Sequence, residues 1–549
     1  MTSTADTALW EELVTSALLG TDRRTPPRAV LTGGKEASAA LLDAAAVHTV
    51  RRRAGLVPAP AAAPPEPAPR DDRPPLPAAA RRRLALLLAD RSAQPSGGRR
   101  GAAPDLTELL PQWLATANEH GYRPPPPLLP ALLDAARART DLRPQALAFA
   151  GSRGLWLARF NPEWRFALRS TSGGGARLPE AADAEAVQRL WEEGLFAERV
   201  ALLTSVRERD AGRALALLSG SWATERAEDR LMFLDSLRAG LSEADEPFLE
   251  QALADRSRNV RATAAELLSA LPRSALAGRM AERAVSCVGP DLTGDGPAAA
   301  VEAPHDCDAD MQRDGVSPTP PTGRGARSWW LGQLVAAAPL SVWTDRFGGR
   351  TAREIVALPV TDGWREELHA AWCRAAVRQR DPEWSRALLG APGAPPESGP
   401  GPSSLAERAR LLETVEERER ADWVADFIAA NGLSEAFQLL GVCAVPWSGP
   451  LGRAVVDALD IARDAGSYPW SFSGVMGLAE RCLDPAEASR LALLTATPDE
   501  TESSAPGTGG YWSEAFQRLV STLRLRAAMH HELTAPQDGD PARAEGSGP

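Results

Sequence analysis

The sequence predicts an all-α fold, an α-solenoid of stacked helical hairpins that is interrupted by disordered insertions rich in Pro and Gly. The chain has 549 residues, and a single hydrophobic core stops growing near roughly 250–300 residues. The length therefore indicates several domains or a stacked repeat array. Ala and Leu, which favour helices, supply much of the 44% hydrophobic content, whereas three Tyr and eleven Phe leave little material for a large sheet.

The net charge of −11 argues against a dedicated nucleic-acid-binding protein, because such proteins neutralise phosphates with a basic surface. The basic residues are almost all Arg, and Lys35 is the single Lys. We interpret this bias as the product of a GC-rich coding sequence. Selection of Arg for bidentate phosphate recognition is the alternative, since a local basic groove is compatible with overall acidity.

The five Cys residues are odd in number and lack a CxxC spacing, which argues against a disulfide framework or a Cys-based zinc site. The N-terminal MTSTADTALWEEL lacks the basic and apolar parts of a signal peptide. No uncharged apolar run reaches the roughly 18 residues that indicate a transmembrane helix. We therefore expect a cytoplasmic protein without membrane contact.

Proline and glycine divide the chain into predicted segments, because these residues interrupt helices. The segments are an N-terminal helical segment at 1–56, a Pro-rich linker at 57–77, a first helical-repeat half at 78–288, a long loop at 289–327, a second helical-repeat half at 328–534 and a disordered tail at 535–549. Two shorter insertions, at 391–404 and 498–510, interrupt the second half.

Two predicted helices begin with similar sequences, NPEWRFAL at Asn161 and DPEWSRALL at Asp381. Asn and Asp side chains cap helices by accepting hydrogen bonds from the first backbone N–H groups, and Pro suits the first helical position because it lacks an N–H. We therefore expect Asn161 to cap its helix with Pro162 as the first helical residue. The same arrangement is expected at Asp381.

The clearest helical pattern lies between residues 225 and 285, where three helices are expected in succession. In the third helix, apolar residues recur at the spacing of one buried stripe: Val260, Ala264, Leu267, Leu268 and Leu271. Together with Asp255 and Arg261, this stripe resembles the HEAT-repeat signature, in which antiparallel helix pairs stack into a solenoid. The resemblance implies a HEAT-like α-solenoid, with structural repeat roles for Asp255, Val260 and Arg261.

The stretch HDCDADMQRDG, at 305–315, places one His, one Cys and four Asp near each other and raises the question of a metal site. The first three Asp residues have the spacing that begins an EF-hand loop, but Met311 and Ser317 stand where that loop needs Gly and Glu. Zinc would need more ligands than His305 and Cys307 supply. We interpret this stretch as a solvated acidic connector and assign no metal.

The rest of the long loop, MQRDGVSPTPPTGRGARSWW, is a candidate partner-binding element, because long loops in folded proteins often carry function. Two adjacent Trp lie about 100° apart on a helix and cannot both face one stripe. One of them is therefore expected to reach a groove or a partner. The candidate partner-binding residues are Arg313, Asp314, Trp329 and Trp330.

Other Trp residues fall in helical segments and are expected in the core: Trp10, Trp113, Trp191, Trp222, Trp364, Trp372 and Trp423. No catalytic motif is complete. TGGKEAS, at 32–38, departs from the phosphate-loop pattern, and HHEL, at 530–533, lacks the second His of a zinc-protease motif. We therefore assign no catalytic, cofactor-binding or metal-binding residue and expect no cofactor.

Three segments stand out: LWEELVTSALLGTDRRTPP, CDADMQRDGVSPTPPTGRGARSWWLGQLVAAAPLSVW and HAAWCRAAVRQRDPEWSRALL. Together they resemble an uncharacterised bacterial family, a domain of unknown function that spans nearly the whole chain. Members of that family tend to be encoded beside a SWIM zinc-finger protein, a MoxR-type AAA ATPase and a von Willebrand factor A protein. The resemblance implies an accessory role with the ATPase and its von Willebrand A partner, and it carries over no catalytic residues.

We therefore expect a non-enzymatic helical-repeat scaffold or adaptor that binds protein partners and is accessory to a MoxR-type AAA ATPase and von Willebrand A system. The alternative is a HEAT-repeat nucleic-acid-binding protein of the DNA glycosylase type. Solenoids of that type hold damaged duplex DNA with Arg, Trp and one Asp, and the 61 basic residues and 16 Trp of this chain keep the alternative open. The net negative charge makes nucleic acid the less favoured ligand.

Overall fold

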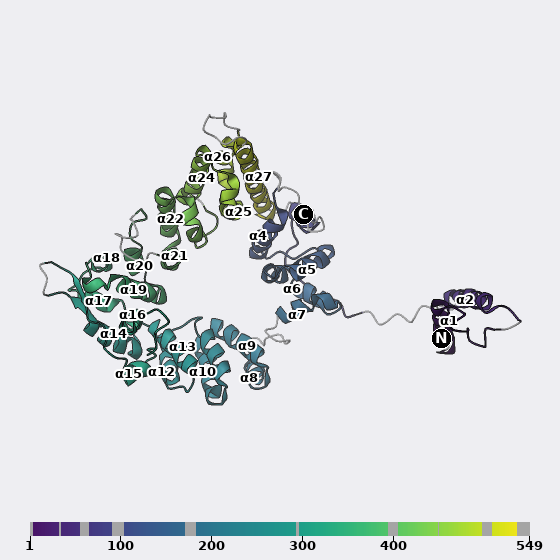
Figure 1. Cartoon of the computed structure of the whole chain (residues 1–549), viewed down its shortest axis with the longest axis horizontal. Coiled ribbons are helices and arrows are strands. Elements are labelled where there is room, and N and C mark those ends of the chain that lie inside the picture. The colour runs from purple at the N-terminus through teal and green to yellow at the C-terminus, as the bar shows by residue number, and fades with distance from the viewer. Residues whose placement is uncertain are drawn as a thin grey trace, which may run out of the picture. The chain divides into compact units, whose positions relative to one another are not determined.

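The computed structural model describes residues 4–31, 34–54, 65–89, 104–170, 183–292, 296–393, 404–447, 449–496 and 508–534. The chain divides into two compact units, residues 1–68 and 69–549. Figure 1 shows that almost all regular structure in both units is helical. The predicted tail at 535–549, most of the two shorter insertions and the first part of the predicted linker, 57–64, lie outside the described residues.

The first unit contains a pair of packed helices, α1 (Thr4–Leu19) and α2 (Ala37–Ala54). The buried side chains between them include Leu13, Ala40 and Leu41. Two helices can bury only one narrow stripe, because each has a single neighbour. Several aliphatic side chains of the pair are consequently exposed: Val14, Leu18, Leu42, Val47 and Val50.

The second unit begins with helices that surround a core of their own. They are α3 (Ala78–Ala89), α4 (Leu106–Glu119), α5 (Leu129–Ala138), α6 (Arg143–Ala158) and α7 (Arg165–Ser170). Trp113 of α4 and Phe149 of α6 meet edge to face in this core, with ring centroids 5.7 Å apart. The 3-10 turn Pro162–Trp164 precedes α7, and the Asn161 side chain accepts a hydrogen bond from the Glu163 N–H at 3.0 Å, which confirms the predicted cap.

The next helices pack against neighbours one or two positions away along the chain, as expected for a stacked array. They are α8 (Ala184–Glu193), α9 (Phe196–Arg209), α10 (Ala211–Ser221), α11 (Ala227–Ser236), α12 (Glu246–Ala252), α13 (Arg258–Ser269) and α14 (Ala275–Cys287). The third helix expected from the sequence is α13. All five apolar residues of its predicted stripe are buried, including Leu271, which lies just after the end of the helix.

The polar residues beside that stripe bind the loop between α12 and α13 to α11 and to the first turns of α13. The Asp255 carboxylate accepts a hydrogen bond from Arg230 of α11 at 3.0 Å, and the Arg261 guanidinium donates to the backbone oxygen of Asp255 at 2.7 Å. Arg261 therefore binds the main chain of Asp255 rather than its carboxylate. Val260 is fully buried in the core between the helices.

Regular structure occurs within residues 289–327, where the sequence predicted only a long loop. Strand β1 (Val288–Pro290) pairs antiparallel with β2 (Ala299–Val301), and a short helix, α15 (Ala309–Arg313), follows. Val288 lies opposite Val301, and both side chains are buried. Strands of three residues are too short for an alternating pattern to be recognised in a sequence, which explains why they were not predicted.

The array then continues to the end of the second unit. Its helices are α16 (Ala326–Ala337), α17 (Ser341–Arg346), α18 (Ala352–Val356), α19 (Arg365–Gln379), α20 (Pro382–Leu389), α21 (Leu405–Thr414), α22 (Glu417–Asn431), α23 (Leu433–Leu440), α24 (Gly449–Asp464), α25 (Ser473–Cys482), α26 (Ala488–Leu493) and α27 (Thr508–Thr534). Asp381 caps α20 by accepting a hydrogen bond from the Trp384 N–H at 3.0 Å, as predicted.

The long helix α27 joins the two cores of the second unit. Its Trp512 and Phe516 belong to the large core built by α8 to α27, whereas its Met529 and Leu533 pack with the core of α3 to α7. The Tyr122 hydroxyl after α4 donates to the backbone oxygen of Leu533 at 2.9 Å. Helices at the start and end of this unit therefore lie side by side, as α4 and α27 do in Figure 1.

The predicted all-α, solenoid-like fold is confirmed, because nearly all regular structure in the described residues is helical and the helices pack mainly on their neighbours in the chain. The single sheet among these residues has two short strands. Within the described ranges, none of the helices combines the length and apolarity that crossing a membrane requires.

Candidate partner-binding site

The centre of the predicted partner-binding element is a tight turn that packs on α13. Met311 and Val316 are buried on either side of this turn. Gly315 adopts a φ of +90°, and a Cβ at this position would lie 2.4 Å from the Cβ of Ala265. Glycine is therefore required here for two reasons, namely the left-handed backbone and the close approach to the helix.

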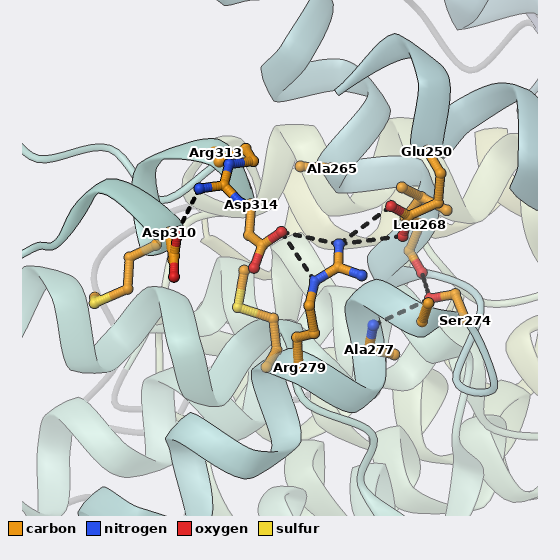
Figure 2. A network of polar contacts seen from close by, with 12 residues as sticks. Glu250, Ala265, Leu268, Ser274, Ala277, Arg279, Asp310, Arg313 and Asp314 are labelled. Atoms are coloured by element: carbon orange, nitrogen blue, oxygen red, sulfur yellow. Dashed lines mark hydrogen bonds and ion pairs between the residues drawn. The ribbon is translucent and has the colours of Figure 1, made fainter. Parts of the chain in front are cut away.

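Asp314 occupies a buried position between two arginines of α14. Its carboxylate oxygens accept hydrogen bonds from Arg279 at 3.0 Å and from Arg283 at 2.6 Å. Figure 2 shows Arg279 also reaching Glu250 of α12, at 3.2 Å. The hydrogen bond to Asp314 is the main cause that raises the pKa of the Arg279 guanidinium above its ordinary value. This arrangement of two carboxylates and two guanidiniums fastens the turn to the array.

Arg313 lies on the outer side of α15, with 69% of its side chain exposed, and pairs with Asp310 of the same helix (Figure 2). Asp308 caps α15 by accepting a hydrogen bond from the Met311 N–H at 2.6 Å. Of the two charged candidates, Arg313 is accessible to a partner and Asp314 is not. A contact between Arg313 and a partner stays a prediction.

The His, Cys and Asp side chains of the 305–315 stretch do not come together at one point. His305 is exposed, with its Nε2 4.0 Å from a carboxylate oxygen of Glu302. Cys307 is half-buried against the large core, and this burial raises the pKa of its thiol. Among the described residues, His, Cys, Asp and Glu form no group of three or more that could hold a metal ion.

Both adjacent tryptophans hold the chain segment that precedes their helix. The indole N–H of Trp329 donates to the backbone oxygen of Ser317 at 3.0 Å, and that of Trp330 donates to the oxygen of Pro318 at 2.9 Å. Gln333, one turn later, accepts from the Ser317 N–H at 2.8 Å. The two indoles therefore bind consecutive residues of the same segment. Each ring is half-buried, so part of each stays accessible.

The seven tryptophans predicted in helical cores divide into two groups. Trp113, Trp191, Trp222 and Trp372 are buried, whereas Trp10, Trp364 and Trp423 are half-buried.

A pocket that the sequence did not indicate lies between α25 and α27. This aromatic pocket has a volume of about 450 Å³ and is lined by Trp470, Tyr511, Met476, Glu480, Glu514 and Arg518, among others. The Trp470 ring stacks on Tyr468, with centroids 4.2 Å apart, and meets the Tyr511 ring edge to face at 5.3 Å. Trp470 is 56% exposed, whereas the other fifteen tryptophans are buried or half-buried.

Local structure holds these aromatic side chains in place. The 3-10 turn η7 (Pro469–Phe472) carries Trp470. The residues just before η7 are held by a hydrogen bond from the buried Trp512 indole N–H to the backbone oxygen of Ser467 at 2.6 Å. Arg518 of α27 binds Glu480 of α25 at 2.7 Å and so holds the two walls together. Two of the three Tyr residues, Tyr468 and Tyr511, contact the Trp470 ring here. Because they lie far apart in the sequence, no local pattern indicates that they come together.

No curated protein matches this chain. A family model described as a family of unknown function (DUF5691) matches residues 12–533. Because the match covers most of the 549 residues, the chain belongs to that family.

Proposed function

We propose that this protein is a non-enzymatic helical scaffold or adaptor that binds protein partners, and that its partners are a MoxR-type AAA ATPase and a von Willebrand A protein. The observation that carries the proposal is the exposed Trp470 of the aromatic pocket. Tryptophan, tyrosine and arginine dominate the residues that contribute most to protein–protein affinity, and such residues gather around a pocket. Trp470, Tyr511 and Arg518 provide this combination.

The location of two strongly perturbed titratable groups also supports a binding role. Catalytic residues tend to combine a shifted pKa with a position in a cleft. Burial lowers the pKa of His369 to about 4 and raises the pKa of the Cys373 thiol. Both side chains are buried within α19, and neither lines the aromatic pocket.

The test is binding between the purified full-length chain and two candidate partners, a purified MoxR-type AAA ATPase and a purified von Willebrand A protein, with and without ATP. We expect Trp470→Ala to weaken binding by about tenfold or more, because truncating a hot-spot residue costs about 2 kcal/mol or more. Tyr511→Ala is expected to act in the same direction. Phe160→Ala is the matched control, because Phe160 is a similarly exposed aromatic residue outside the pocket.

Two results would count against the proposal. The first is a wild-type chain that binds neither protein under any nucleotide condition. The second is a Trp470→Ala variant that binds as tightly as the wild type while its circular dichroism spectrum is unchanged.

A further inference from the structure

A second pocket lies among the first helices of the second unit and is rich in arginine. This arginine pocket has a volume of about 600 Å³ and is lined by Arg81 and Arg82 of α3, by Arg123, by Arg153 of α6 and by the prolines at 124–127. No carboxylate of the described residues belongs to its lining. Its remaining walls are formed by apolar residues.

Pro75 and Leu76 line the arginine pocket, and the residues just before them are bound to the surrounding chain. Arg73 pairs with Asp71 at 2.8 Å and donates to the backbone oxygen of Phe149 at 3.0 Å. It passes so close to α6 that a Cβ on Gly151 would lie 2.4 Å from its guanidinium nitrogen, and Gly151 interrupts the helix with a φ of +58°. Arg123 donates to the Asp71 backbone oxygen at 2.9 Å.

Among the described residues, Arg123 is the arginine of this pocket that has an electrostatic partner, the Asp71 carboxylate. Arg81, Arg82 and Arg153 form no ion pair with any carboxylate in the described part of the chain. The nearby Asp71 is bound to Arg73, and Glu532 is bound to Arg83. Guanidiniums gathered in one pocket repel one another, so an anion that enters gains attraction from several charges at once.

We infer that the arginine pocket binds an acidic peptide segment of a partner protein. The guanidinium fork matches the geometry of carboxylates and can bind them with two hydrogen bonds. The walls of Pro, Leu and Ala suit aliphatic side chains, and they offer no aromatic ring on which a nucleic-acid base could stack. The pocket is not fully enclosed, which suits an extended peptide better than a small molecule that must be enclosed.

The charge of the whole protein sharpens this selection. With a net charge of −11, the protein as a whole opposes the approach of an acidic segment, so attraction depends on local groups of positive charge. A partner of that kind is therefore directed to the few places where positive charge is concentrated. This inference concerns a different site from the aromatic pocket, so its test can fail without affecting the function proposed above, and the reverse also holds.

The test uses the full-length protein and a fluorescently labelled peptide in which glutamate and leucine alternate, followed by anisotropy. We expect saturable binding that weakens as salt is added, because surface charges are screened. The double substitution Arg81→Ala, Arg82→Ala should weaken binding by about tenfold or more, since it removes two charged hydrogen-bond donors. Alanine favours helices, so α3 should be preserved.

The matched control is Arg51→Ala, Arg53→Ala, which removes the same charge from exposed positions of α2 in the first unit. The inference predicts that this control binds the peptide as the wild type does. It is overturned if the wild type does not bind, or if both double variants lose the same affinity. It is also overturned if a single-stranded oligonucleotide or inorganic phosphate competes better than the unlabelled peptide, because the ligand would then be phosphate.

Discussion

Three buried charged side chains of the described residues, Arg207, Asp245 and Asp314, are each paired with an opposite charge. Arg207 is completely buried, binds Asp245 at 2.7 Å and also donates to the backbone oxygen of Leu237 at 3.0 Å. Asp314 is balanced by Arg279 and Arg283. A buried charge costs several kcal/mol unless it is paired and hydrogen-bonded. Each such pair therefore favours an arrangement in which its two elements stay in contact, because separating them would leave a buried charge unpaired.

Asp314 attaches the turn after α15 to α14 through its ion pairs with Arg279 and Arg283. We expect Asp314→Asn to destabilise the second unit by about 2 kcal/mol, because two partly buried guanidiniums lose their carboxylate. This figure lies below that of a fully buried pair because Arg279 is about one-third exposed. Chemical unfolding measures the loss. Asp310→Asn is the control, since the exposed pair with Arg313 should contribute less than about 1 kcal/mol.

Equal losses in the two Asp variants would contradict the assignment of Asp314 as an internal anchor. So would a variant at Asp314 that unfolds as the wild type does.

His369 predicts a dependence of stability on pH. Burial lowers its pKa in the folded protein to about 4, from an ordinary value of 6.5. Between these values the unfolded chain binds the proton and the folded chain does not, so stability falls as pH falls. Lowering the pH from about 7 to about 5 should cost about 2 kcal/mol through this residue.

The variant His369→Phe should lose this part of the pH dependence, because Phe cannot take up a proton. The measurement is the midpoint of urea unfolding at the two pH values. The exposed His530, changed to Phe, is the control and should keep the wild-type pH dependence. An unaltered pH dependence in His369→Phe would contradict the burial effect.

At the scale of elements, the turn after α15 and the two indoles on α16 together hold α13, α14 and α16 in contact with one segment of chain. The turn contacts α13 through Gly315 and α14 through Asp314, and Trp329 and Trp330 hold the segment that follows. Three helices are therefore connected by one short stretch of chain. A substitution at Gly315 that moves this turn can therefore disturb the packing of several helices.

We expect Gly315→Ala to destabilise the protein by about 2–3 kcal/mol, because it adds a clash with Ala265 to the strain of a left-handed backbone. Gly323→Ala is the matched control. Gly323 has a similar φ of +85°, but a Cβ added there would meet no atom within 4 Å, so this variant reports the strain alone. Thermal unfolding should give a larger shift for Gly315→Ala, and equal shifts would contradict the close packing on α13.

At the scale of the whole molecule, α27 makes the second unit cohesive. Contacts between its end and α3 and α4 join segments separated by more than 400 residues, as in the ion pair between Arg83 and Glu532 at 2.7 Å. Stacked arrays usually make contacts only between neighbours in the chain. The additional contact couples the core of α3 to α7 to the core of the later helices.

Leu533→Ala tests this coupling. Removing a buried leucine side chain should cost about 2–5 kcal/mol, and the loss should appear first in the core of α3 to α7, which contains Leu533. Hydrogen exchange followed by mass spectrometry should show faster exchange in α3 and α4 than in α19. His530→Ala, an exposed change on the same helix, is the control. Uniform acceleration in all helices would contradict a separate role for this core.

Much of the local structure could be predicted from short stretches of sequence. The caps at Asn161 and Asp381 and the buried stripe that includes Val260 appear where the sequence predicted them. The sequence predicted an N-terminal helical segment at 1–56, and the structure has helices there at Thr4–Leu19 and Ala37–Ala54. These features depend on residues within a few positions of one another, so local pattern and capping chemistry suffice.

The candidate sites required tertiary structure. The sequence singled out Asp314 and the two adjacent tryptophans, but only the fold reveals that Asp314 is enclosed by Arg279 and Arg283 and that both indoles bind their own chain. The aromatic pocket unites Trp470 with the distant Tyr511, and no local pattern indicates this approach.

The sequence by itself therefore determined the helical class, the positions of several helices and the absence of a complete catalytic motif, because periodicity, capping and motif spacing are local properties. Only the tertiary structure decided which charges are internal, which aromatic side chains are accessible and which arginines gather in one pocket. The physical reason is that burial and pairing depend on contacts between residues far apart in the chain. Those contacts arise only when the helices stack and α27 packs on α3 and α4.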